Sequence, residues 1–237
     1  MSGNPDRDLV DELRRVLAAG ADPERAAAEQ RYMKSVMPYR GWTLPAMRKA
    51  VLPVVGDPQR RVPRRPDWEA TVRLLFDDAS YREERYAAIE LAAHPQYRDW
   101  QDPDTIPLYR HLIVTGAWWD LVDGVAAEQV GGILATHRAD LTPLMRAWSV
   151  DDDMWLRRSA IISQLQHKER TDLDLLTDAV DANLEGSTFG SEFFIRKAIG
   201  WALRQHARVA PDWVRAFVAD RTERLSGLSR REALKHL

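Results

Sequence analysis

The sequence contains no cysteine, which excludes disulfides, thiol nucleophiles, iron–sulfur clusters and cysteine-based zinc sites. Histidines are few and are not arranged in HExxH or any other close metal-ligand spacing. We therefore expect the protein to use neither a metal ion nor another cofactor. The six histidines are His94, His111, His137, His167, His206 and His236.

Long apolar runs are also missing. No segment approaches the ~18 consecutive apolar residues of a membrane span, and residues 1–20 lack the apolar centre of a signal peptide. We therefore expect a cytoplasmic protein. The alternating pattern typical of β-strands is almost absent as well, which favours an all-α protein.

A basic excess is absent too. The chain has 34 Lys and Arg against 36 Asp and Glu, a net charge of −2, which argues against a general nucleic-acid binder. A curved protein could still sort its basic residues onto one face. Basic clusters occur, but the ordinary interpretation of any one of them is a solvated surface. They lie at Arg60–Arg65, Arg157–Arg158, Arg196–Lys197, and Arg230–Arg231 with Lys235.

Segments with helical period make up most of the chain, separated by prolines and short polar groups. The 237 residues, 45% of them hydrophobic, suffice for one domain or one repeat array with a sizeable core. Thr43 predicts one helix start, and Ser229 with Glu232 predicts another through a capping box. The predicted helices cover Asp6–Ala19, Pro23–Val36, Thr43–Val54, Pro66–Phe76, Tyr81–Ala93, Asp104–Val114, Trp118–Ala135, Leu141–Trp148, Asp152–His167, Asp172–Asn183, Ser191–His206, Pro211–Ala219, and Ser229 onward.

The helices repeat. Residues 156–162 align with residues 195–201 at an offset of 39, and Arg85–Ile89 fits the same template one step earlier than the helix after Trp118. A period near 40 with paired helices is typical of HEAT or armadillo repeats. We predict one domain over 1–237, a curved superhelical array of HEAT-like helix pairs. Its second helices would line a concave groove carrying Asp123, Arg158 and Lys197/Trp201 at similar heights.

The segment Trp118–Asp123 is the most informative one in the sequence. Trp119 and Asp123 are four residues apart, so on a helix they share a face, and an aromatic surface lies beside a fixed negative charge. Such a pair stabilises cations. With Arg158 and Trp201, it suits a positively charged ligand next to a phosphate.

Several long motifs resemble the AlkD-type HEAT-repeat alkylpurine DNA glycosylases, the DNA alkylation repair family. The similarity covers nearly everything from Arg31 to the C-terminus. The motifs are RYMKSVMPYRG (31–41), REERYAAIELA (82–92), TGAWWDLVDGVA (115–126), MWLRRSAIISQLQHK (154–168), EFFIRKAIGWALRQHA (192–207) and LSRREALKHL (228–237).

The resemblance assigns roles to particular residues. Four positions that meet the damaged nucleotide in the family correspond to Trp119, Asp123, Arg158 and Trp201, all unchanged here. Arg158 is expected to grip a backbone phosphate, since its planar fork of donors suits that task. Further DNA-binding candidates are Tyr32, Lys197, Phe193 and Phe194.

The resemblance also implies an activity: hydrolysis of the N-glycosidic bond of positively charged N3- or N7-alkylated purines in duplex DNA. Asp123, Trp119 and Trp201 would stabilise a cationic sugar, and no lysine nucleophile is needed, which implies a monofunctional enzyme. In the family the base can stay stacked rather than enter a closed pocket. We expect a monomer that associates with the nucleoid when it acts on DNA. The chain stops after LKHL, where family members often continue, which leaves open a longer native C-terminus.

Two other functions remain open on the sequence alone: a non-catalytic HEAT-repeat module that binds DNA structures or proteins and, with less support, an RNA-binding role. Structural roles are also open for the site residues. Trp119 and Trp201 could pack in the core, Asp123 could cap a helix or pair with an Arg, and Arg158 could pair with Glu192 or Asp153. The presence of Asp123 beside Trp119 favours the enzyme. We expect core or inter-repeat packing for Trp42, Trp68, Trp100, Trp148, Trp155 and Trp213.

Overall fold

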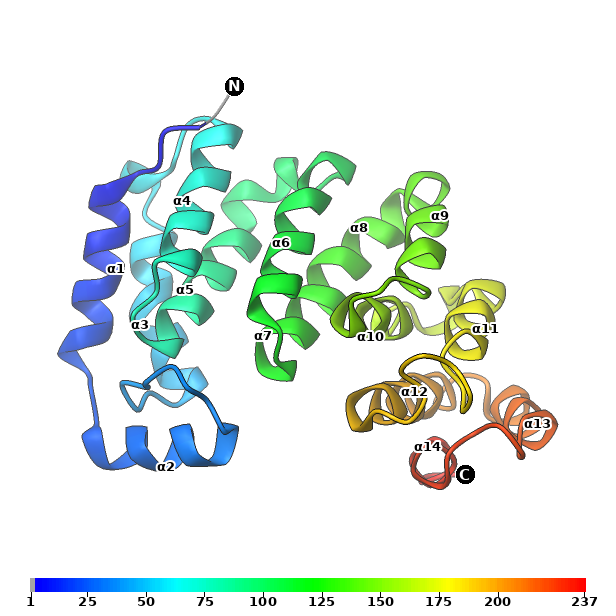
Figure 1. The fold of residues 1–237 in the computed structure, drawn as a ribbon. Coiled ribbons are helices and arrows are strands. Elements are labelled where there is room, and N and C mark those ends of the chain that lie inside the picture. The colour runs from blue at the N-terminus through cyan, green and yellow to red at the C-terminus, as the bar shows by residue number, and fades with distance from the viewer. Residues whose placement is uncertain (1–2) are drawn as a thin grey trace. The chain divides into compact units, whose positions relative to one another are not determined.

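The protein is helical throughout the part that the structure describes. A computed structural model describes residues 3–237, and within that range there are α-, 3-10 and π-helices but no β-strand (Figure 1). This confirms the all-α prediction. No helix within residues 3–237 combines the length and the apolar character needed to cross a membrane.

The chain divides into two compact units, one ending at Gln101 and the other spanning Asp102–Leu237. The single domain over 1–237 and the curvature of the predicted array stay predictions. The two units are therefore described separately.

The first unit consists of five α-helices and two short 3-10 helices. Helices α1, α3, α4 and α5 pack on one another around buried residues such as Leu13, Met47 and Leu75. A second group joins the buried Trp68 and Tyr97 to the half-buried Trp100 through ring contacts of 5.2–5.4 Å between centroids. The elements are α1 (Arg7–Ala19), α2 (Pro23–Met33), α3 (Leu44–Val55), η1 (Pro58–Arg60), α4 (Arg65–Asp77), α5 (Arg82–Ala93) and η2 (Pro95–Trp100).

The second unit continues with nine α-helices. Most consecutive helices pack on one another, and α10 lies against α12, which in turn lies against α14 (Figure 1). The elements are η3 (Pro103–Thr105), α6 (Ile106–Gly116), α7 (Trp119–Gly124), the π-helix η4 (Val125–Val130), α8 (Gly131–Thr136), α9 (Arg138–Trp148), α10 (Met154–Ile162), η5 (Lys168–Arg170), α11 (Leu173–Asp181), α12 (Phe193–His206), α13 (Pro211–Asp220) and α14 (Gly227–Ala233).

One apolar core connects the C-terminal helices of the second unit. It contains Ile161, Leu176, Ile199 and Phe217, which come from α10, α11, α12 and α13. Because successive helices bury their apolar faces on each other, side chains on α10 and α12 are held at fixed positions relative to one another.

Every predicted helix is present, but two details of the predictions were wrong. Ser226, not Ser229, caps α14, since its hydroxyl accepts from the Ser229 amide at 3.0 Å. Ser229 is buried, and its hydroxyl donates to the Arg196 carbonyl instead. The segment predicted as one helix over Trp118–Ala135 contains the π-helix η4 in its middle. Thr43 caps α3 as predicted.

Candidate active site

A sharp corner between α6 and α7 presents the Trp118–Asp123 segment. Ala117 ends α6 in the left-handed region, with φ 43°, and Trp118 follows in an extended conformation, with φ −154°. A left-handed non-glycine residue costs roughly 1–2 kcal/mol, and such strain tends to occur at functional positions. The Trp118 carbonyl then accepts from the amides of Leu121 and Val122, which starts α7.

Trp119 and Asp123 both belong to α7 and share a face of it, as the spacing predicts. Trp119 is 37% exposed, which is high for a tryptophan, so it is not the core aromatic that was the alternative. The Asp123 side chain is 15% exposed. An indole face and a carboxylate that both keep contact with solvent are thus offered by one short helix.

Arg158 of α10 holds both oxygens of the Asp123 carboxylate with one edge of its guanidinium. Its Nε donates to Oδ1 and its Nη2 to Oδ2, each at 2.7 Å. Its Nη1 donates to the backbone carbonyl of Phe194 in α12. The pair ties α7, α10 and α12 together, and only 5% of the Arg158 side chain is exposed. We call Asp123, Arg158 and the Phe194 carbonyl the carboxylate clasp.

The clasp leaves hydrogen-bonding capacity on both partners. A carboxylate has about four lone-pair sites and Arg158 uses two of them, so Asp123 can still accept from water. A guanidinium has five N–H groups, of which Arg158 uses three. The two that remain suit a phosphate oxygen.

Burial raises the pKa of the Asp123 carboxyl above its ordinary value, and the charge of Asp120 acts in the same direction. The hydrogen bonds from Arg158 and its positive charge oppose that shift. The carboxyl is consequently poised between a desolvated environment, which favours a proton, and a cation, which favours the anion. Such groups are typical of sites that bind or transform a ligand.

The π-helix η4 lies between Asp123 and Gly131, two positions at which this helical segment contacts α10 or the residues that follow it. Asp123 contacts Arg158, and farther along, the Gly131 carbonyl contacts the His167 ring at 2.8 Å. A Cβ at Gly131 would lie 2.4 Å from the Ser163 carbonyl, so only glycine allows this approach. In a regular α-helix, positions 123 and 131 would differ by about 80° around the axis. The wider π turn reduces that difference, so both face α10.

An aromatic cluster lies next to the clasp. Trp118 packs against Trp155 and Phe194 with centroids 6.2 and 5.3 Å away, and Phe194 also contacts Phe193 at 5.5 Å. Trp118 and Trp155 are therefore packing residues, as expected for Trp155. Phe194 is partly buried and contributes its ring to the cluster and its carbonyl to the clasp, whereas Phe193 is 57% exposed and available to a ligand.

Trp201 and Lys197 lie farther along α12 on the face that carries Phe194. Trp201 packs partly against the core of the second unit. Lys197 pairs with Glu232 of α14 at 3.1 Å, and Arg204 pairs with the same carboxylate. The hydrogen bond from Lys197 is the main reason why the pKa of Glu232 is lowered. Within residues 3–237, neither Lys197 nor Trp201 hydrogen-bonds to the clasp.

The remaining predicted residues lie in the first unit. Tyr32 of α2 is 78% exposed, and its role in DNA binding stays a prediction. The Arg60–Arg65 cluster is largely engaged locally: Arg64 pairs with Asp67 at 2.7 Å, Arg65 with Glu69 at 3.2 Å, and Arg61 lies over Trp100. That arrangement fits a surface segment rather than a free basic patch.

The structure corrects the partners considered for Arg158. Asp153 caps α10 through the amides of Trp155 and Leu156, and Glu192 begins α12 without a side-chain cap bond. The observed partner is Asp123, so the suggested pairs with Glu192 and Asp153 were wrong. Asp123 does pair with an arginine, which was its structural alternative, yet it stays partly open to solvent.

Two features of the site were not predicted. One is the π-helix η4, and the other is the use of the Phe194 carbonyl as the third member of the clasp. Composition carries no signal for either, although the paired glycines Gly131–Gly132 in a helical segment mark an unusual packing position. Within residues 3–237, no group of three His, Asp or Glu side chains is placed to hold a metal ion.

Comparisons with known proteins fit this geometry. Residues 13–237 match the sequence profile of the family described as DNA alkylation repair enzyme. A solved structure titled "Predicted DNA alkylation repair enzyme from Enterococcus faecalis" is 29% identical, with a TM-score of 0.80, over 92% of this chain and 96% of that one. A search among curated proteins found no match. These matches support a role as a DNA repair enzyme, and the chain belongs to the DNA alkylation repair enzyme family.

Proposed function

We propose that the protein is a monofunctional DNA glycosylase that hydrolyses the N-glycosidic bond of positively charged N3- or N7-alkylated purines in duplex DNA. The observation that carries the proposal is the carboxylate of Asp123, fixed by Arg158 but still open to solvent beside the exposed face of Trp119. A fixed anion next to an indole face suits a cation that forms during the reaction.

The chemistry needs little more than this pair. In an alkylated purine the base already carries a positive charge, so when the bond between C1′ and the base nitrogen breaks, its electron pair neutralises the base. The sugar becomes an oxocarbenium-like cation. Asp123 stabilises that charge and orients a water molecule, whose oxygen bonds to C1′ and whose proton passes to Asp123 and then to solvent. Removing one such electrostatic group commonly costs a hundredfold or more in rate.

The tryptophans would contact the cationic nucleotide. Trp119 offers its exposed face beside Asp123, and each cation–π contact of this kind is worth about 0.5–2 kcal/mol. Trp201 is more buried and would contribute the side of its ring that the core leaves uncovered. Because these contacts recognise charge rather than a base edge, neutral lesions should be poor substrates, and the base need not be enclosed.

Arg158 would serve both the carboxylate and the DNA. Its two unused N–H groups can donate to a phosphate next to the lesion, while the other three maintain the clasp. Lys197, Phe193, Phe194 and, from the first unit, Tyr32 would add contacts to the DNA backbone and sugar. A protein that acts in this way on duplex DNA needs no second copy, so we propose a monomer.

The proposal is tested by single-turnover release of free base from a duplex that carries one N7-methylguanine. We expect release well above the uncatalysed rate, little release from the neutral lesion O6-methylguanine, and an abasic product. We also expect no covalent adduct after borohydride treatment, because no lysine forms a Schiff base. If the protein binds the duplex but leaves the depurination rate unchanged, the protein is a binding module and the proposal is wrong.

A further inference from the structure

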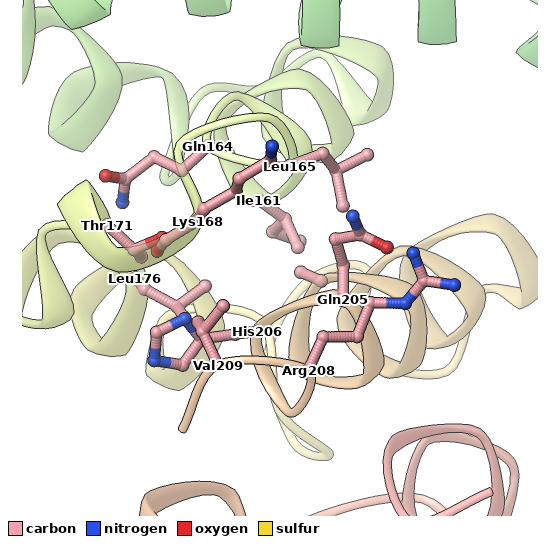
Figure 2. Close-up of a pocket in the computed structure, with 11 residues that line it drawn as sticks. Ile161, Gln164, Leu165, Lys168, Thr171, Leu176, Gln205, His206, Arg208 and Val209 are labelled. Atoms are coloured by element: carbon pink, nitrogen blue, oxygen red, sulfur yellow. The ribbon is translucent and has the colours of Figure 1, made fainter. Parts of the chain in front are cut away.

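A small cavity lies at the other end of α10 and α12 from the clasp. Its volume is about 130 Å³, and Gln205, which lines it, is about 16 Å along α12 from Phe194. Figure 2 shows side chains from the end of α10 and the turn after it on one side of the cavity, and side chains from the end of α12 and the turn after it on the other. Its apolar wall consists of Ile161, Leu165, Leu176, Ala202 and Val209.

The rim of the cavity carries two cationic side chains, and the loop on one side of it is held by hydrogen bonds. Gln164 fixes the loop between α10 and α11, because its side chain accepts from the amide of Asp172 at 2.8 Å and donates to the Asp172 carbonyl at 2.9 Å. Lys168 and Arg208 line the cavity and form no ion pair within residues 3–237. No acidic side chain is among the described residues that line it.

A buried histidine in the wall lacks hydrogen-bond partners. His206 is 8% exposed, and within the described part of the chain neither of its ring nitrogens has a partner. The ring packs edge-on against Trp213, with centroids 5.3 Å apart. Burial lowers the pKa of His206, so its ring is neutral and offers one N–H donor and one acceptor. Buried polar groups normally find a partner in the protein, in ordered water or in a ligand.

We propose that this cavity is a binding site for a small aromatic carboxylate, separate from the active site. An apolar cavity of about 150 Å³ accommodates a benzene ring, so the wall here can take a ring of similar size. The carboxylate would lie at the rim with Lys168 and Arg208, and His206 would donate its N–H to the anion. Because no acidic residue lines the cavity, an anion fits there better than a neutral or cationic molecule of the same shape.

Benzoate is the probe that tests the site. Titration should show saturable binding of one equivalent at millimolar concentrations or below, and the ring nitrogens of His206 should shift in histidine-labelled NMR spectra. Benzamide, which has the same shape without the charge, should bind at least about fivefold more weakly because it loses the charge-assisted contacts. No saturable binding, or equal binding of benzoate and benzamide, would overturn the proposal.

Two surface-compatible variants separate this site from general charge effects. Lys168 has φ 52°, a conformation that asparagine tolerates, so Lys168→Asn should fold and weaken benzoate binding at least about threefold. Lys34→Asn is the matched control, since Lys34 is an exposed lysine with φ 51° in the other unit, and it should not change binding. His206→Phe should keep the thermal midpoint and reduce binding. Equal effects of the two lysine variants would count against the site.

Discussion

The two compact units each contain a carboxylate held by several donors, and they hold it differently. In the first unit, Glu83 is fully buried and accepts from the backbone amides of Arg40, Gly41 and Trp42 at 2.8–3.2 Å. In the second unit, Asp123 is held by the side chain of Arg158 and keeps part of its surface in solvent.

The difference separates a structural carboxylate from one that we propose to be catalytic. Glu83 is surrounded by fixed backbone donors and sealed from water, so it fixes the turn before α3 and cannot reach a ligand. Asp123 has one side-chain partner, unused lone pairs and an exposed tryptophan beside it, which suit the catalytic role that we propose for it.

The largest expected effect is on stability, from Glu83→Gln. The amide loses the charge and places N–H donors where backbone N–H groups already point, which should cost about 3 kcal/mol in the free energy of unfolding. For a chain of this size the thermal midpoint should fall by roughly 6–10 °C. Calorimetry measures the fall, and single-turnover excision by the folded variant should change less than about threefold. A large loss of excision with an unchanged midpoint would reverse the assignment.

Arg158→Lys should lower the single-turnover excision rate by about tenfold to thirtyfold. An ammonium group cannot bond both oxygens of Asp123 and the Phe194 carbonyl at once, so the carboxylate loses its fixed orientation. Arg221→Lys is a matched control, because Arg221 holds Asp181 through the same two-bond geometry at 2.6 and 2.8 Å. Equal losses in both variants would mean that the clasp has no special role.

Trp119→Leu should reduce excision by about threefold to tenfold, the value of one partly exposed cation–π contact, with little change in stability. Trp118→Leu should show the opposite pattern, a lower thermal midpoint and a smaller change in the rate per folded molecule, because its ring packs in the aromatic cluster. Rates at saturating protein and thermal melts distinguish the two. A Trp119→Leu variant with a lower thermal midpoint and a normal excision rate would contradict the proposal that Trp119 contacts the substrate.

The smallest expected effect is the pH dependence of the excision rate, which appears on the acid side and not near neutrality. Burial raises the pKa of Asp123, so the ionised, active form is lost as pH falls through a value above the ordinary aspartate pKa. Single-turnover rates should fall on the acid side with a slope of one proton, after correction for uncatalysed depurination. The residual activity of an Asp123→Asn variant should lack this limb. An acid limb retained in that variant would assign the titration to another group.

Much of the fold could be predicted because helical period, prolines and caps are local signals. The Thr43 cap and the pairing of Trp119 with Asp123 on one face follow from spacing alone. The offset of 39 between α10 and α12 also placed Arg158 and Lys197 at equivalent positions.

The rest depends on packing between helices. Ser229 fits a capping box by pattern, but α12 approaches so closely at Gly200 that Ser229 is buried and bonds to the Arg196 carbonyl. The partner of Arg158 was missed for the same reason, because a guanidinium can reach several acids and only the approach of α7 to α10 selects Asp123. The π-helix has no composition signal because it reflects the register between neighbouring helices.

The most direct test of the central claim is the single-turnover release of N7-methylguanine from duplex DNA by the wild-type protein and by Asp123→Asn. The account predicts that wild-type protein exceeds the uncatalysed rate and that the variant loses about a hundredfold, roughly 2.7 kcal/mol of transition-state stabilisation, while its thermal midpoint changes much less than that of Glu83→Gln. Equal rates for the wild type and the variant would show that Asp123 is a structural carboxylate like Glu83.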